Sequence, residues 1–305
     1  MVVVQALRQA AAEVAAQAQW VAVDRDQIAL YAASLPDAPP LVAPLLSDAR
    51  ERREVTLFWL TLDAINFGSG WFPTLRKRPG RSGYTTVSSG VRHRFDAHGP
   101  WSASELAAVD AREIAAALDQ DPEHELMGRF AASLNDLGAQ LDGDYEGDPL
   151  ALLEAAGGSA VTLVETLAAW MSFADVSVLD GHELAFLKRA QILAADLARA
   201  GAARFDDLAE LTMFADNLVP HVLRLDGILS FAPELVERID AEELIAHGSR
   251  EEIEIRACAL HAVELIVAAS PGPVTAAQID QLLWQRGQGR LYKARPRHRS
   301  RCTAY

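Results

Sequence analysis

The stretch EEIEIRACALHAVELIVAA, residues 251–269, repeats apolar side chains every three or four positions, as a helix does when it buries one face. Four more segments share this spacing: Val3 to Tyr31, Ser104 to Leu118, Glu183 to Ala200 and Ala209 to Asn217. We therefore predict a mainly α fold with helical structure in each of these segments.

One stretch departs from the helical pattern. Between Arg76 and Phe95, the sequence RKRPGRSGYTTVSSGVRHRF is punctuated by glycine and proline and is rich in Thr, Val and Tyr, which favour strands. We predict a small β-hairpin there, near residues 82–95.

No interdomain linker is evident along the chain. The breaks at Ser34–Pro44, Asp142–Asp148 and Ser270–Pro273 are short, and no repeat of solenoid length is present. With 305 residues, of which 50% are apolar, the chain can bury a substantial core. We expect a single globular unit with an N-terminal helical lobe, about residues 1–150, and a C-terminal helical lobe, about residues 151–305.

Charge is distributed unevenly. The net charge is −14, yet seven Lys or Arg residues and no acid lie between Arg286 and Arg301, so the preceding part of the chain is strongly acidic. Such a body repels a nucleic-acid backbone, and we predict no nucleic-acid partner. The basic run alone is typical of a solvated tail or a nucleic-acid arm. The interleaved Trp284, Leu291 and Tyr292 instead favour packing on the acidic body.

Cysteine usage and hydropathy indicate the compartment. Cys258 and Cys302 are too few for a disulfide framework, and neither has a second Cys or a His at metal-ligand spacing. The first residues lack a signal-peptide pattern, and no apolar run reaches the roughly 20 residues that cross a bilayer. We predict a soluble, cytoplasmic protein with no membrane partner.

The motifs of several enzyme classes are missing from the sequence. The eight histidines form no HExxH or HxH cluster, and the chain has no P-loop, no GxSxG and no GxGxxG followed by a helix. His261, three residues before Glu264 on an apolar helix, is more typical of a buried polar pair than of a metal site. We predict neither a metal nor an organic cofactor.

Aromatic side chains gather around a glycine turn in FWLTLDAINFGSGWFP, residues 58–73. A helix-like apolar run ends there at Asn66 and Phe67, directly before Gly68-Ser69-Gly70. Rings beside a flexible turn suit stacking on a planar ligand, which makes Phe67 a candidate binding residue. The alternative is a glycine-capped helix end with aromatic core anchors, which is common.

Charged residues enter apolar surroundings in SFADVSVLDGHELAFLKR, residues 172–189. A turn at Asp180-Gly181 precedes a helix that we predict from His182. Lys188 then shares a helical face with apolar neighbours, where its ammonium either snorkels outward or enters a cavity that holds an anion. Asp175 is equally typical of an ordinary turn residue.

The third candidate stretch is LTMFADNLVPHVLRLDGILSF, residues 211–231. Asp216 lies among apolar residues, where an unpaired carboxylate is costly to bury. Pro220 predicts a break near residues 217–219 and a new helix that starts at Pro220. Asp216 then faces the positive end of that helix, which favours the ionised carboxylate that electrostatic catalysis needs. The alternative is that Asp216 is merely a helix cap.

Several stretches, in order across nearly the whole chain, carry a resemblance to one family. They are DAINFGSGWFP from Asp63, SFADV from Ser172, FLKRAQILAADL from Phe186, LTMFAD from Leu211, RACALHAVEL from Arg256, LWQRGQ from Leu283 and YKARPRHRSRCTAY from Tyr292. Together they resemble the queuosine salvage family, the queuosine-5′-phosphate N-glycosylases. The resemblance is global because the matching stretches span the chain.

The resemblance implies a helical fold akin to helix-hairpin-helix DNA glycosylases, with Leu225–Leu229 as a loose match to the hairpin turn. It implies hydrolysis of the N-glycosidic bond of queuosine 5′-phosphate and release of queuine, without a cofactor. The family's active carboxylate closes a Phe-Ala-Asp triplet, which here falls on Asp216. The residues that follow line the base pocket, here Asn217 and His221. Many members read Asp-Tyr-Arg-x-Pro-Gln where this chain reads Asp-Asn-Leu-Val-Pro-His.

The resemblance also suggests roles for the other candidates. Phe67 and Phe173 would stack on the base, Asp175 would receive the cationic amine that carries the cyclopentenediol, and Lys188 would bind the phosphate. Asp216 would stabilise positive charge on the ribose or deprotonate the attacking water. Two rival functions stay open: a DNA or RNA base glycosylase of related fold, which needs a continuous basic face, and a non-catalytic helical binding protein, which needs a large exposed groove.

Overall fold

The chain folds into two units, each assembled from segments that are far apart in the sequence. The computed structural model describes residues 2–305. Unit 1 contains residues 2–40, Asp175–Lys188 and Ala209–Arg301, and unit 2 contains Leu41–Ala174, Arg189–Leu208 and Cys302–Tyr305. The units are therefore interleaved along the chain, whereas we had expected two lobes that divide near residue 150.

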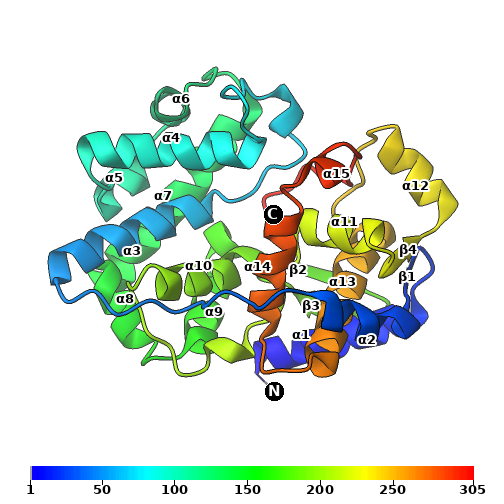
Figure 1. Cartoon of the computed structure of the whole chain (residues 1–305). Coiled ribbons are helices and arrows are strands. Elements are labelled where there is room, and N and C mark those ends of the chain that lie inside the picture. Colours follow the sequence, from blue (N-terminus) through cyan, green and yellow to red (C-terminus); the bar gives the residue numbers. More distant parts are fainter. Residues whose placement is uncertain (1) are drawn as a thin grey trace. The chain divides into compact units, whose positions relative to one another are not determined.

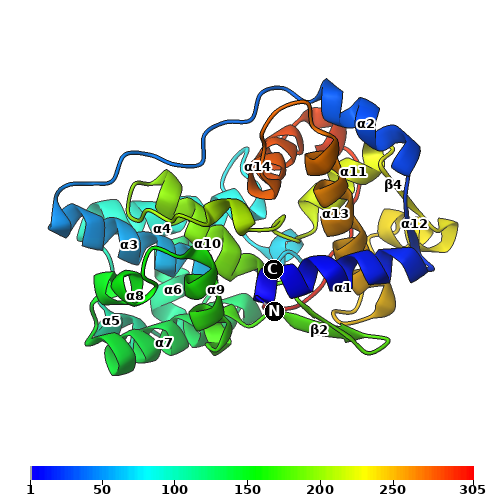
Figure 2. The same ribbon diagram turned by 90° about the horizontal axis from the view of Figure 1, so that it is seen from below.

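Unit 1 is built around the long helix α13, Arg250–Ala269. Ser249 caps it by accepting a hydrogen bond from the Glu252 amide, and most of its side chains are buried. Within the unit, α13 contacts α1, α2, α11, α14 and the two-stranded sheet of β1 and β4 (Figures 1 and 2). The other elements of unit 1 are α1 (Val3–Gln17), β1 (Val21–Val23), α2 (Arg25–Ser34), β2 (Val176–Leu179), β3 (His182–Ala185), α11 (Leu218–Leu225), β4 (Leu229–Phe231), α12 (Pro233–Asp240), α14 (Ala276–Arg286) and α15 (Arg290–Lys293).

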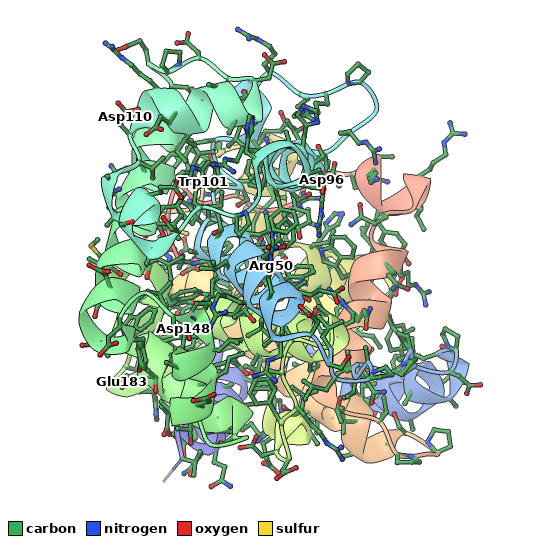
Figure 3. All side chains as sticks on the ribbon, turned by 90° about the vertical axis from the view of Figure 1, so that its left-hand side faces the viewer. Arg50, Asp96, Trp101, Asp110, Asp148 and Glu183 are labelled. Atoms are coloured by element: carbon green, nitrogen blue, oxygen red, sulfur yellow. The ribbon has the colours of Figure 1, made fainter. Side chains whose placement is uncertain are left out.

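Unit 2 is helical, with α7, Glu125–Tyr145, in contact with α3, α5, α6 and α8. Aspartate N-caps begin three of its helices, at Asp48, Asp110 and Asp148, of which the last two are labelled in Figure 3. Its elements are α3 (Ala49–Ala64), η1 (Phe72–Thr74), α4 (Gly83–His98), α5 (Ala103–Ala108), α6 (Ala111–Leu118), α7, α8 (Pro149–Ala155), α9 (Ala160–Ala168) and η2 (Met171–Phe173). Two more, α10 (Lys188–Arg199) and η3 (Leu208–Glu210), include residues of both units. The predicted mainly α fold is confirmed.

The predicted β-hairpin near residues 82–95 is wrong, because this stretch forms helix α4. Ser82 and Thr85 make a capping box that starts the helix, each side chain accepting a hydrogen bond from the other's backbone amide. The buried residues then follow helical spacing, at Thr86, Val87, Gly90 and Val91. Burial of this face outweighs the strand preference of the Thr and Val residues.

The hairpin lies elsewhere, at β2 and β3, which pair antiparallel with Val176 opposite Ala185. Its two-residue turn is Asp180-Gly181, both with positive φ, a typical pairing for a tight hairpin. We had predicted the turn correctly but a helix after it. That helix, α10, begins only at Lys188.

Two further helical predictions need correction. The stretch from Val3 to Tyr31 is interrupted by β1, which pairs with β4. The stretch from Ala209 to Asn217 has no helix beyond the 3-10 turn η3. Side-chain hydrogen bonds hold its backbone instead, and they define the candidate site described below.

The basic run between Arg286 and Arg301 packs on the rest of unit 1 as expected, although Leu291, one of its interleaved apolar residues, is exposed. The Arg224 guanidinium donates to the Pro296 carbonyl at 3.1 Å, and Arg299 pairs with Glu242 at 2.7 Å. The Tyr292 ring is buried. These residues are therefore part of the folded unit.

The turn that the resemblance assigns to a helix-hairpin-helix, Leu225–Leu229, contains Gly227 at a φ of 80°. It leads from α11 into strand β4, and a helix, α12, follows only at Pro233. The likeness to helix-hairpin-helix glycosylases stays a prediction.

No single helix within residues 2–305 has the length and apolar composition to span a membrane. Among the same residues, α8 and α9 taken together reach that length and composition, but they are bent by 115° with respect to each other.

Candidate active site

The segment Leu211–Asn217 in unit 1 has no regular secondary structure, yet it is held residue by residue. The Phe214 amide donates to Asp280 Oδ1 on α14 at 3.0 Å. The next residue, Ala215, accepts from Arg256 Nε on α13 at 2.9 Å through its carbonyl. Neighbouring helices thus fix the backbone directly before Asp216.

Asp216 is fixed by the start of α11. Its Oδ1 accepts hydrogen bonds from the backbone amides of Leu218, at 2.7 Å, and Val219, at 3.3 Å. We had predicted that Asp216 faces the positive end of a new helix, and this is confirmed, with the helix starting at Leu218 rather than at Pro220. Pro220 fits the first turn because its missing N–H needs no partner there.

Asp216 is also distinguished by its exposure. Every residue from Leu211 to Leu223 is buried except Asp216, which is half-buried. Its Oδ2 makes no hydrogen bond within the described part of the chain. An otherwise buried and immobilised segment therefore presents one carboxylate oxygen that is available to another molecule.

Asn217, the last residue of the segment, is also held by a hydrogen bond. Its side-chain Nδ2 donates to the carbonyl of His298 at 3.1 Å, and its side chain is buried. Its amide nitrogen is therefore committed to the C-terminal segment of unit 1.

His221 is buried on α11, one turn after Asp216. Its Nε2 lies 2.9 Å from the Tyr292 carbonyl. Because a carbonyl only accepts, Nε2 carries the proton and Nδ1 is left as an acceptor. Burial lowers the pKa of His221 to about 4, although the hydrogen bond to Tyr292 opposes this. His221 is a neutral imidazole near pH 7, and Nδ1 has no partner within residues 2–305.

Asp175 precedes β2 and is 2% exposed. Its Oδ2 accepts from Arg256 Nη2 at 2.6 Å and from the backbone amide of Lys188 at 3.0 Å. Its buried Oδ1 has no partner among the described residues. Asp175 is thus more than a turn residue, and one of its oxygens can still accept a hydrogen bond.

Lys188, the candidate for an anion, is 4% exposed and begins α10. A side chain that snorkels to solvent would expose its ammonium, so this low exposure favours the alternative of a buried charge.

Arg256 was missed by the sequence analysis. We noted its stretch, RACALHAVEL, only as part of the family resemblance. In the structure its fully buried guanidinium links Asp175 to Ala215 and also pairs with Glu252 at 3.4 Å. The available signal was an arginine within a strongly apolar helix, a position that requires buried partners.

Arg297 was also missed. It is partly buried, and burial lowers the pKa of its guanidinium while the negative charge of Asp216 opposes this shift. The two charges are near enough to interact although they form no ion pair. The C-terminal segment thus places a cation in the field of Asp216.

The remaining candidates, Phe67 and Phe173, lie in unit 2. Both rings are buried, and the Arg189 guanidinium lies 5.1 Å from the Phe67 ring and 5.7 Å from the Phe173 ring. Phe67 also makes an edge contact with Phe130, with ring centroids 5.1 Å apart. Within unit 2, both rings therefore form part of the core, and their role in stacking on a base stays a prediction.

No group of three or more His, Cys, Asp or Glu side chains within residues 2–305 is arranged to hold a metal ion. His261, discussed above as one member of a polar pair with Glu264, instead has Arg25 as its hydrogen-bond partner, at 3.2 Å.

Comparison with known proteins identifies the family. Residues 46–305 match the family described as queuosine salvage protein. A relative from Sphaerobacter thermophilus is 35% identical over 304 residues, which cover 95% of this chain and 94% of the relative. Relatives from Bos taurus (32% identical over 73% of this chain and 72% of theirs) and Schizosaccharomyces pombe (33% over 74% and 70%) carry the same name, queuosine 5′-phosphate N-glycosylase/hydrolase. The chain belongs to the queuosine salvage protein family.

Proposed function

We propose that this chain hydrolyses the N-glycosidic bond of queuosine 5′-phosphate and releases queuine and ribose 5-phosphate. The names of its relatives support the substrate. The observation that carries the reaction type is Asp216, the one residue of an otherwise buried, immobilised segment with a carboxylate oxygen free to meet a ligand.

Asp216 acts on the ribose. As the bond from C1′ to the base nitrogen breaks, positive charge develops on the sugar, and a fixed carboxylate stabilises it or deprotonates the attacking water. Two backbone amides hold Oδ1, so the carboxylate needs little reorganisation when charge develops. Oδ2 is the oxygen that meets the sugar or the water.

His221 and Asn217 contact the base. The imidazole of His221 is neutral and its Nε2 proton is committed to Tyr292, so Nδ1 can only accept a hydrogen bond from the substrate. His221 therefore does not protonate the leaving base. Backbone amides are left as the groups that stabilise negative charge on the departing 7-deazaguanine.

The other predicted contacts complete the substrate site. Asp175 receives the cationic amine of the cyclopentenediol substituent at Oδ1, the oxygen that has no partner in the described chain. Lys188 binds the 5′-phosphate. No step requires a metal or an organic cofactor.

We place this activity in the cytoplasm. The two cysteines, Cys258 and Cys302, are free and buried, which is consistent with a reducing compartment. The rival reading as a nucleic-acid glycosylase is less well supported, because basic residues of the C-terminal run are engaged within unit 1.

The test is mass-spectrometric detection of free queuine after incubation of the purified protein with queuosine 5′-phosphate, with and without a chelator. We expect release that survives chelation. Absence of queuine with the wild-type protein would remove the hydrolase proposal, and loss of release on chelation would show that a metal takes part.

A further inference from the structure

We propose that Arg256 is a positioning residue for this reaction: it holds the backbone of Asp216 and the carboxylate of Asp175 in fixed orientation without itself touching the substrate. The inference rests on the proposed function, because Asp216 and Asp175 are the groups that it orients.

All three nitrogens of the Arg256 guanidinium donate hydrogen bonds, each to a different partner. Nε donates to the Ala215 carbonyl at 2.9 Å, Nη2 to Asp175 Oδ2 at 2.6 Å, and Nη1 to Glu252 Oε1 at 3.4 Å. Its central carbon lies 3.9 Å from the centre of the Phe186 ring. A planar, five-donor group can satisfy these partners at once, and a lysine ammonium at the same place cannot.

The bond to Ala215 acts on Asp216 directly. The Ala215 carbonyl belongs to the peptide group that joins Ala215 to Asp216, so its orientation sets the start of the Asp216 backbone. On the other side, the α11 amides hold the Asp216 carboxylate. Asp216 is thus clamped through its backbone by one helix and through its side chain by another.

The contacts around Arg256 leave one oxygen of Asp175 available for binding. Glu252 is fully buried and stays ionised, since hydrogen bonding from His247 and the Arg256 charge lower the pKa of its carboxyl to about 2 against the opposing effect of burial. Two carboxylates therefore share one guanidinium. Asp175 Oδ1 is the oxygen of this group without a partner in the described chain, so it can accept a hydrogen bond from a cationic amine.

Arg256 itself is fully buried, so its effect on catalysis is indirect. Lysine at position 256 keeps the positive charge beside Asp175 and Glu252 but cannot also hold the Ala215 carbonyl. The prediction is a loss of orientation at Asp216 with the fold preserved.

The experiment compares Arg256→Lys with Arg250→Lys. Arg250 lies on the same helix and bridges Asp180 at 2.5 Å and Glu254 at 3.3 Å, but within residues 2–305 it makes no hydrogen bond or ion pair with the segment Leu211–Asn217. We measure kcat and KM for queuine release below the unfolding temperature, together with hydrogen exchange of the amides in residues 211–219.

For Arg256→Lys we expect kcat to fall roughly 10- to 100-fold with KM changed far less, because a small misplacement of a catalytic group has effects of this size. Amide exchange in residues 211–219 should accelerate. Arg250→Lys should lose thermal stability without either effect.

Wild-type kcat and wild-type exchange in a folded Arg256→Lys protein would overturn the inference. If Arg256→Lys fails to fold, the double variant Arg256→Gln/Asp175→Asn removes the guanidinium together with the carboxylate 2.6 Å from it, while Glu252 keeps the Gly248 amide as a partner; this variant is read by the same exchange measurement. Failure of the proposed function has a different signature: the wild-type protein itself releases no queuine, and the exchange data then decide alone whether Arg256 immobilises Asp216.

Discussion

Two irregular, buried segments differ in how they are held. Residues 65–71 in unit 2 turn at Gly68, with a φ of 103°, and their Phe67 ring packs against Phe130 and Arg189. Hydrogen bonds also hold residues 65–71, since the Gly68 amide donates to the Tyr305 carbonyl at 3.1 Å and Trp71 Nε1 to Glu125 at 2.9 Å. The segment Leu211–Asn217 in unit 1 differs because its hydrogen bonds fix the residues around a half-buried carboxylate, that of Asp216. The Phe67 ring is held by packing, which has no preferred direction, whereas directional hydrogen bonds hold the Asp216 carboxylate. The contacts of residues 65–71 stabilise the fold. Those of Leu211–Asn217 do so as well and also orient the carboxylate of Asp216.

The largest loss of stability is expected from a substitution of Phe67 in residues 65–71. Phe67→Ala should lower the free energy of unfolding by about 3–5 kcal/mol, the usual cost of removing a buried phenylalanine ring. Chemical denaturation measures it, with Phe67→Leu as the milder control. A loss under about 1 kcal/mol would contradict a core role. If Phe67 also stacks on the base, folded Phe67→Leu will show a raised KM.

Two buried histidines outside the segment Leu211–Asn217, His221 and His298, should make the protein sensitive to acid. Burial lowers the pKa of His221 to about 4 and that of His298 to about 3. The unfolded chain therefore binds more protons than the folded one below about pH 6.5, and stability falls as pH decreases from there toward 4. Each histidine contributes on the order of 2–3 kcal/mol.

Thermal unfolding between pH 7.5 and 4.5 checks this dependence. His221→Asn should flatten part of the curve, while the same change at the exposed His93 should leave it unaltered. A His221→Asn profile parallel to wild type would show that His221 does not stay neutral in the folded protein.

A smaller loss of stability is expected when one of the hydrogen bonds that hold the segment Leu211–Asn217 is removed. Asp280→Ala removes the acceptor for the buried Phe214 amide and should cost about 1–3 kcal/mol of stability. Asp280→Asn keeps an acceptor oxygen and should cost less. Equal losses in the two variants would mean that the charge of Asp280, and not its bond to Phe214, is what matters.

Local pattern explains which parts of the fold the sequence could predict. Helix α13 was predicted because its apolar spacing persists over many turns. Residues 82–95 were misjudged because composition was weighed above the helical spacing and the capping box. The two-residue turn at Asp180-Gly181 was found, but the strands beside it are only four residues long and leave little periodicity to detect.

In the candidate site, too, only features with a local sequence signal could be predicted. The position of Asp216 at a helix start followed from Pro220, a nearby signal. The role of Arg256 did not, because its partners Ala215 and Asp175 are 41 and 81 residues away in the sequence. Contacts of this range depend on the assembled fold and leave no periodic trace in the sequence.

The central claim is that Asp216 is the catalytic carboxylate. Its most direct test is the rate of queuine release by Asp216→Asn beside Asp226→Asn, since these two aspartates flank the same helix, α11. Asparagine is as good a helix cap as aspartate, so Asp216→Asn should keep the stability of the wild type. Asp226 accepts hydrogen bonds from Tyr31, at 2.5 Å, and Tyr292, at 2.6 Å, so its substitution should lower stability.

We predict that Asp216→Asn lowers kcat at least roughly 1,000-fold in a protein that still folds and binds substrate, with a far smaller loss for Asp226→Asn. Undiminished release by Asp216→Asn would contradict the account and move the catalytic carboxylate to another residue, such as Asp175 or Asp226.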